Sequence, residues 1–251
     1  MDIPAVIFGV TISTTHVPGG VEIADTAVQD VGFVLVALFF AHLGRRRVAA
    51  WQFGLRPTPL WRAVRLVALT LVGFLIFSVV WALALNTGKE KLLEQLGAGQ
   101  NAALLVLSAG LTCVVAPICE EFFFRGYIFT ALRNWRGTWP AAVITGLLFG
   151  GVHAGSAPAV DLVPLAVLGF ALCLLYRYTG SLYPCIAVHS LNNSIAFGGL
   201  ENWSLAGVIA LMVSALALIG VIALALKRVG VITPEPAGTE ADAFGPVAAR
   251  D

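Results

Sequence analysis

The chain has 251 residues, of which 59% are hydrophobic and only 12% are charged, and its mean hydropathy is +0.89. Soluble domains carry about 25% charged residues, so this composition excludes an ordinary soluble domain. The long apolar runs do not alternate as barrel strands do, so we expect an all-α, polytopic transmembrane helical bundle. The formal net charge of +1 argues against a nucleic-acid partner.

The hydrophobic runs divide the chain into three predicted parts. Residues 1–28 form an N-terminal extramembrane or interfacial segment, because their apolar stretch is too short to span a membrane. Residues 29–228 form the transmembrane domain. Residues 229–251 contain three prolines and many alanines and acids, which predicts a disordered cytoplasmic tail.

About seven spans are expected in the transmembrane domain. In chain order they are 31–43, 66–85, 102–133, 139–153, 160–176, 184–197 and 205–226. A continuous helix over the third run would be about 45 Å long, which exceeds the hydrocarbon core, so a tilt or a break at Pro117 is expected.

The basic residues predict an orientation. With the N-terminus outside, the arginines between 45 and 65, Arg133 with Arg136, Arg177, and Lys227 with Arg228 all fall on one side. Cytoplasmic loops carry an excess of lysine and arginine, so this side should be the cytoplasm. The chain is therefore predicted to be an integral membrane protein with an external N-terminus and a cytoplasmic C-terminus. Its alanine, glycine and valine content suits a bacterial cytoplasmic membrane.

The third run contains two adjacent acids, Glu120 and Glu121, followed by Arg125. An ionised carboxylate in hydrocarbon costs several kcal/mol or more, so such a group normally has a partner or a function. On a helix, Glu121 and Arg125 stand four residues apart and can touch, whereas Glu120 is turned about 100° away. Glu121 is thus the paired acid and Glu120 the free one. The structural alternative is that both acids merely tie two helices together through Arg125.

Two more polar pairs lie inside predicted spans. Phe149 and His153 are four residues apart in the fourth span, and His189 and Asn193 are four apart in the sixth, so each pair shares a helix face. Counted from the helix ends, these side chains and Glu120 reach similar depths. A carboxylate, two imidazoles and a carboxamide around water would make a hydrolytic site between the third, fourth and sixth spans.

The order Glu-Glu-x-x-x-Arg, Phe-x-x-x-His, His-x-x-x-Asn resembles the signature of the CAAX prenyl protease and bacteriocin-processing family (CPBP, also called Abi) of intramembrane endopeptidases. The resemblance covers residues 104–197, and Ser181-Leu182-Tyr183-Pro184 resembles the lead-in to the third motif. Each motif alone is weak, but three in order on three hydrophobic helices are specific.

The resemblance implies a role for each motif residue. Glu120 with His153 would bind and deprotonate the attacking water, and His189 with Asn193 would donate hydrogen bonds to the oxyanion. Glu121, Arg125 and Phe149 would support them. The substrate would be a membrane-associated peptide or lipidated protein, prenylated or bacteriocin-like, and membrane lipid the surroundings. The sequence does not indicate an oligomeric state.

The same residues leave the cofactor open. Glu120, His153 and His189 could be the three protein ligands of a catalytic zinc, and the family is often labelled metalloprotease on such grounds. A metal-free mechanism uses the same side chains and is the one favoured here.

Two other functional classes remain. In a proton-coupled transporter Glu120, His153 and His189 would form a proton relay, although the sequence shows no inverted repeat. In a non-catalytic membrane scaffold or immunity protein they would bind a partner.

Overall fold

A computed structural model describes residues 19–44, 48–85, 102–154 and 156–234, and within these residues every regular element is a helix. The α-helices are α1 (Gly19–Gly44), α2 (Leu60–Leu85), α4 (Ala102–Gly110), α5 (Ala116–Glu121), α6 (Thr130–Arg136), α7 (Thr138–Val152), α8 (Leu162–Thr179), α9 (Leu182–Leu200) and α10 (Leu205–Arg228). The short elements are the 3-10 helices η1 (Ala50–Phe53) and η4 (Ala159–Asp161) and the π-helices η2 (Leu111–Val115) and η3 (Phe122–Phe129).

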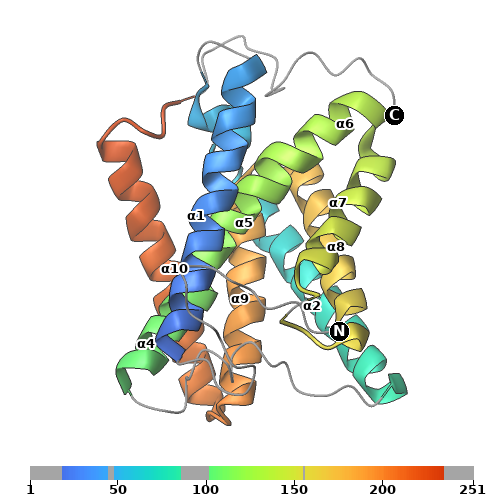
Figure 1. The fold of residues 1–251 in the computed structure, drawn as a ribbon, viewed down its shortest axis with the longest axis vertical. Helices are drawn as coiled ribbons and strands as arrows, with labels where there is room; N and C mark the ends of the chain where they lie inside the picture. Colours follow the sequence, from blue (N-terminus) through green and yellow to red (C-terminus); the bar gives the residue numbers. More distant parts are fainter. Residues whose placement is uncertain (1–18, 45–47, 86–101, 155, 235–251) are drawn as a thin grey trace, which may run out of the picture.

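The elements from α4 to α6 run on without interruption, so the described helices form seven rods packed as one bundle (Figure 1). The prediction of an all-α polytopic bundle is confirmed. Five rods are long and apolar enough to cross a membrane. The other two are α7, which has only 15 residues, and the more polar α9. The chain is an integral membrane protein whose two least membrane-like rods carry the predicted histidines.

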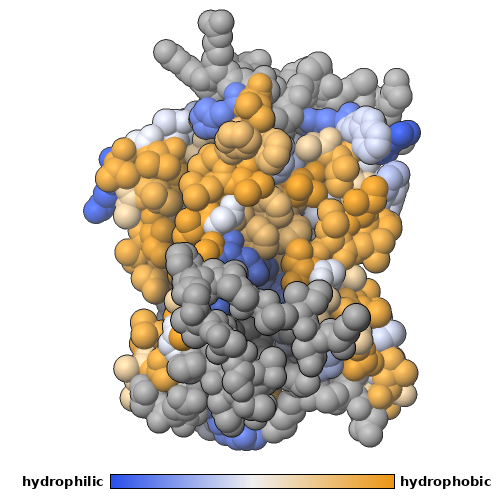
Figure 2. Space-filling view, viewed as in Figure 1, coloured by the Kyte–Doolittle hydropathy of each residue, from blue (hydrophilic) through white to orange (hydrophobic). Residues whose placement is uncertain are grey.

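The outer rods face outward with their apolar side chains. In the apolar windows of α2 and α10 only 6% and 11% of residues are buried, against 39% for the rod from Ala102 to Arg136. Figure 2 shows the resulting hydrophobic surface, with a small hydrophilic patch in the middle of the face. Lipid therefore solvates α2 and α10, and the long rod from α4 to α6 forms the centre of the bundle.

The ends of the bundle differ in part from the predicted boundaries. Helix α1 begins at Gly19, and its apolar stretch runs from Ile23 to Leu43, so the first span starts well before 29 or 31. Residues 1–18 of the predicted N-terminal segment lie outside the described residues. Helix α10 ends at Arg228 as expected, and most of the predicted tail, residues 235–251, also lies outside them.

The central rod does not break at Pro117, where a tilt or a break was expected; instead, two π-helical segments lie on either side of α5. The Ala116 N–H bonds to Leu111 O, five residues back. Pro117 has no N–H to offer to the carbonyls of Thr112 or Cys113. Helix α9 supplies donors instead: Asn193 Nδ2 lies 2.9 Å from Thr112 O, and Ser190 Oγ lies 2.6 Å from Cys113 O. The π-helical segment in one helix thus fixes its contact with another, and π-helical turns are frequent at functional sites.

Helices α7 and α8 meet backbone to backbone through glycines. A Cβ atom at Gly146 would lie 2.7 Å from Ala166 O, and one at Gly150 would lie 2.6 Å from Leu162 O. From the other side, a Cβ at Gly169 would lie 2.8 Å from Phe149 Cβ. Small residues at this spacing let membrane helices approach closely. The close contact leaves little freedom to the last turn of α7, which ends next to His153.

The start of α9 is anchored to the loop before α2. The Ser181 hydroxyl donates to Arg56 O at 2.6 Å, and the Leu182 N–H donates to Gly54 O at 2.8 Å. Arg56 Nε in turn donates to Gly180 O at 2.6 Å. These contacts hold the end of α8, the beginning of α9 and η1 together at one end of the bundle.

Candidate active site

Three charged or polar side chains form a buried cluster at the centre of the bundle. Glu121 Oε1 accepts hydrogen bonds from Arg125 Nη1 and from His189 Nδ1, both at 2.8 Å. Arg125 Nη2 donates to Gly169 O at 3.0 Å, so the cluster joins the central rod to α8 and α9. Glu121 and Arg125 are fully buried. The contact predicted between Glu121 and Arg125 is confirmed, and Glu121 has a second partner, His189, that was not predicted.

Phe149 contacts Arg125 of this cluster and both imidazoles. The Arg125 guanidinium carbon is 4.5 Å from the centre of the Phe149 ring, a cation–π contact. The centres of the His153 and His189 rings lie 5.1 and 5.6 Å from the same ring. The fully buried Phe149 thus brings histidines from α7 and α9 to one place in the bundle.

His153 stands at the C-terminal cap of α7. Its Nδ1 lies 2.7 Å from Phe149 O. A carbonyl oxygen only accepts, so Nδ1 carries the hydrogen and, in the neutral ring, Nε2 keeps a lone pair. Helix α7 is about 22 Å long, less than the roughly 30 Å of hydrocarbon, so a backbone end lies at membrane depth and requires polar surroundings.

Glu120 has no strong partner. It is 7% exposed, and its Oε2 accepts no hydrogen bond from any residue that the structure describes. The nearest basic group is Nε2 of His189, at 4.0 Å. Because Nδ1 of His189 donates to Glu121, this Nε2 carries a lone pair when the ring is neutral. The separation exceeds a direct hydrogen bond and suits one bridging water.

Asn193 is bonded elsewhere. Its Nδ2 donates to Thr112 O, and its Oδ1 accepts a long contact of 3.4 Å from Asn192 Nδ2. One N–H of the Asn193 amide remains for another acceptor. The predicted oxyanion donors therefore differ: Asn193 has a spare donor, whereas His189 Nε2 can donate only when the imidazole is protonated.

The side chains as placed do not fit a zinc ion. Glu120, His153 and His189 were the ligand set that the sequence allowed. Among the described residues, no three His, Cys, Asp or Glu side chains are grouped closely enough to hold a metal.

Asp30 of α1 is a site residue that sequence reasoning missed. The side chain is fully buried, and neither carboxylate oxygen accepts a hydrogen bond from any described residue. It lies close enough to Glu120 and His189 for their charges to act on it. The signal was present, because an acid inside an apolar span is a functional candidate, but the predicted span began one residue after it.

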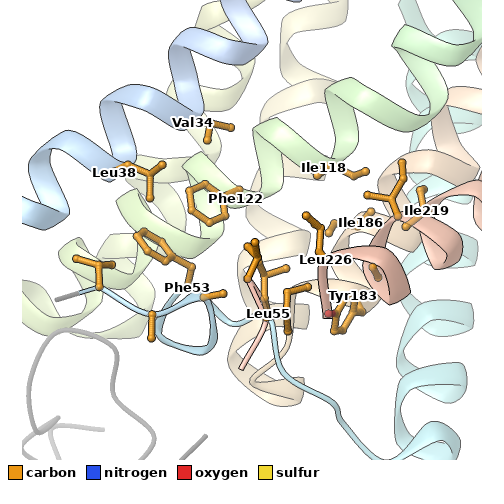
Figure 3. Close-up of a pocket in the computed structure, with 17 residues that line it drawn as sticks. Val34, Leu38, Phe53, Leu55, Ile118, Phe122, Tyr183, Ile186, Ile219 and Leu226 are labelled. Atoms are coloured by element: carbon orange, nitrogen blue, oxygen red, sulfur yellow. The ribbon is translucent and has the colours of Figure 1, made fainter. Parts of the chain in front are cut away.

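A separate cavity of about 320 Å³ lies between α1, η1, α5, α9 and α10 (Figure 3). Its lining is almost wholly apolar and includes none of the candidate site residues. Val34 in this lining is one helical turn from Asp30, whereas Ile118 and Phe122 lie about 160° around the central rod from Glu120. The cavity is thus a neighbour of the polar site and not part of it.

Comparisons with known proteins match the region of the chain that contains these residues. Residues 102–195 match the family described as type II CAAX prenyl endopeptidase Rce1-like. Over 84 residues the chain is 32% identical to the Bacillus subtilis protein named "Putative membrane peptidase YdiL", covering 34% of this chain and 33% of that protein. No solved structure matches.

Two other bacterial relatives cover more of the chain. An uncharacterized protein of Mycoplasma capricolum is 28% identical over 188 residues, 70% of this chain, and the chain spans 55% of its length. The UPF0177 protein YxdF of Lactococcus lactis is 24% identical over 160 residues, 61% of this chain and 86% of that protein.

The matched region, 102–195, contains all seven residues predicted for the site and its support. The buried acid doublet and the two histidines from separate helices therefore lie in a region that matches an endopeptidase family. These matches are consistent with the resemblance to the CPBP family.

Proposed function

We propose that the protein is an intramembrane endopeptidase in which Glu120 activates water. The supporting observation is the contrast between the two adjacent acids: Glu121 makes two contacts of 2.8 Å through Oε1, with Arg125 and His189, whereas Glu120 Oε2 lies 4.0 Å from His189 Nε2 and accepts no hydrogen bond from any described residue. Oε2 of Glu121 is also without a described donor, so the contrast lies in the two bonds that hold Glu121. A buried carboxylate with an unused lone pair beside basic groups is suited to general base work.

The proposed reaction uses only side chains of this chain. Glu120, assisted by His153, takes a proton from a water molecule, and the water oxygen attacks the peptide carbonyl carbon. The oxyanion accepts hydrogen bonds from the protonated His189 ring and from the spare N–H of Asn193. Glu120 then gives its proton to the leaving amine, which breaks the C–N bond.

Cleavage of a peptide library by purified protein in liposomes tests this proposal. We expect wild-type protein to cleave and Glu120→Gln to lose activity by about 10²–10⁴-fold while it still inserts and melts like wild type. The matched control is Glu201→Gln, at the end of α9 and away from the site. Undiminished cleavage by Glu120→Gln excludes the assignment. Solute uptake without cleavage would instead indicate a carrier, and neither activity would indicate a scaffold.

We also propose that the reaction needs no metal. The side chains of Glu120, His153 and His189 do not gather into a metal-binding group in the described part of the chain, whereas each keeps a use in the water mechanism. Full activity of chelator-treated protein with no stoichiometric zinc by elemental analysis is the expected result. Activity that disappears with the chelator and returns with zinc would contradict it.

A lipidated protein or peptide is the proposed substrate. The apolar cavity is next to the polar site along α1, and its size is at the lower end of the range of about 300–1,000 Å³ for ligand pockets. A single hydrocarbon chain on the substrate would fit such a lining. Ala223→Trp, which fills the cavity from α10, should reduce cleavage of a lipidated peptide more than cleavage of the same peptide without lipid. Equal effects on both peptides would argue against this use of the cavity.

The orientation in the membrane is a proposal as well. Arg133 and Arg136 end α6, Arg177 lies in the last turn of α8, and Lys227 with Arg228 ends α10. By the positive-inside rule these ends face the cytoplasm. Labelling of cysteines introduced after Arg136 and before Gly19 in intact cells would test it.

A further inference from the structure

Asp30 is the one acid of α1 that is fully buried within the described residues. It lies on the face of α1 that contains the buried Ala37 and Ala41, and this face packs against α5 and η3. Phe33, three residues further on, stacks on Phe123 with ring centres 4.8 Å apart. The position of Asp30 is therefore set by the packing of α1 against the central rod.

The surroundings of Asp30 offer no compensation for its burial. Both carboxylate oxygens lack a hydrogen-bond donor among the described residues, and so does Oε2 of Glu120. The charge of Glu120, which acts on Asp30 more than that of His189, opposes a second negative charge there. Burying a carboxylate without a donor is costly, so a carboxylate kept in this place for stability alone is unexpected.

Two buried acids with unused acceptors, on helices that pack against each other, have a simple chemical use. A water molecule has two hydrogens, and it is oriented when each is donated to a fixed acceptor. If one hydrogen points to Glu120 and the other to Asp30, the oxygen lone pairs are directed away from both carboxylates, toward an incoming carbonyl. Orientation of this kind is a large part of what an active site contributes.

We propose that Asp30 is a positioning residue of the hydrolytic site, which accepts the second hydrogen of the attacking water and so orients it on Glu120. The inference rests on the proposed endopeptidase function. With Asp30, α1 also contributes to the site. The residues predicted from the sequence all come from the central rod, from α7 with its C-terminal cap, and from α9.

The test compares Asp30→Asn and Asp30→Ala with Asp25→Asn, an exposed acid on the same helix. Asparagine keeps one acceptor oxygen, and alanine keeps none. We expect kcat to fall by about 10-fold for asparagine and up to about 100-fold for alanine, with KM nearly unchanged. The melting temperature in detergent should stay level or rise in both variants, because a buried acid without a donor is removed. Asp25→Asn should match wild type in each measurement.

The outcomes separate the inference from the function on which it rests. Absence of cleavage by the wild type would overturn the endopeptidase and the role of Asp30 together. Wild-type cleavage with unchanged kcat in both Asp30 variants would overturn the inference alone. A parallel loss of melting temperature and activity in both variants would show that Asp30 serves the fold, and would also overturn it. Lower kcat at an unreduced melting temperature supports it.

Discussion

Two groups of buried charged or polar side chains meet at adjacent acids of the central rod, Glu120 and Glu121. The groups differ in the hydrogen bonds that they make. The paired group comprises Glu121, Arg125 and His189, which meet in two contacts of 2.8 Å, although Glu121 Oε2 and Arg125 Nε have no partner among the described residues. The unpaired group comprises Glu120 and Asp30, where three carboxylate oxygens accept nothing from any described residue. One helical step, from Glu120 to Glu121, separates them.

The difference separates two tasks. In a membrane, a bonded group of charges costs little more than its desolvation and can hold helices in register. An unbonded group destabilises the folded protein unless another molecule completes it. We therefore expect substitutions in the paired group to reduce stability first. Substitutions in the unpaired group should reduce turnover at little cost in stability.

Arg125→Met should have the largest effect. It leaves the Glu121 carboxylate buried with His189 alone and removes the contact to Gly169 O. Breaking a buried pair by removing one partner costs about 3–5 kcal/mol of unfolding free energy. Unfolding in mixed micelles should show this loss.

The control for Arg125 is Arg136→Met. Arg136 is an exposed arginine, with its guanidinium 4.0 Å from the centre of the Trp135 ring. Surface changes of this kind usually stay within about 0.5 kcal/mol. Equal losses for the two variants would mean that the buried cluster is not what holds the central rod.

His153→Ala should act mainly on turnover. The loss of the Nε2 lone pair is expected to lower kcat by about 10²-fold or more. The loss of the hydrogen bond to Phe149 O should cost about 1 kcal/mol of stability.

His42 offers a close match for His153. Its Nδ1 likewise lies 2.7 Å from the carbonyl four residues back, Leu38 O, but it is exposed at the end of α1. His42→Ala should leave kcat unchanged. A similar loss of turnover in both variants would point to a general effect on the helix ends and not to a role in the site.

Ser190→Ala should have an intermediate effect on stability. It leaves Cys113 O, which Pro117 cannot serve, without the Ser190 donor. An unsatisfied buried acceptor costs about 1–3 kcal/mol. Ser194→Ala is the control, because that buried hydroxyl donates to Ser190 O within its own helix and not to a carbonyl of the central rod. A larger loss for Ser194 than for Ser190 in thermal melting would contradict this reading of the π-helical segment.

The smallest expected effect is a coupling between Pro117 and Ser190. In Pro117→Ala, the new N–H can serve Cys113 O or Thr112 O, so the added cost of Ser190→Ala should shrink by about 0.5–1 kcal/mol. A double-mutant cycle on unfolding free energies measures it. Strictly additive losses would show that the proline does not determine this contact between helices.

Short-range spacing predicted part of the site from the sequence. The four-residue interval placed Arg125 against Glu121 and turned Glu120 away, because the helix continues through both acids. The same interval placed His153 and Phe149 on one face, and their rings are in contact. Intervals within one helix are fixed by helix geometry, so they can be read without knowing the neighbours.

Contacts between helices could not be read in that way. The bond between His189 and Glu121 and that between Asn193 and Thr112 depend on how α9 is rotated against the central rod. The rotation in turn depends on two carbonyls near Pro117 that need donors. Asp30 was missed for a simpler reason: the apolar stretch of α1 runs from Ile23 to Leu43, whereas the predicted span began at 31, one residue after the acid.

Gly169 has a consequence for how the site can vary. Its carbonyl receives Arg125, and its Cα side leaves room for Phe149, whose own carbonyl holds His153. The acid cluster and His153 are therefore both positioned by the backbone of α8 at Gly169. If α8 slides or tilts in a bilayer of different thickness, the acid cluster and His153 should move with it. The distances between the reacting groups should therefore change little when a different lipid displaces the outer helices.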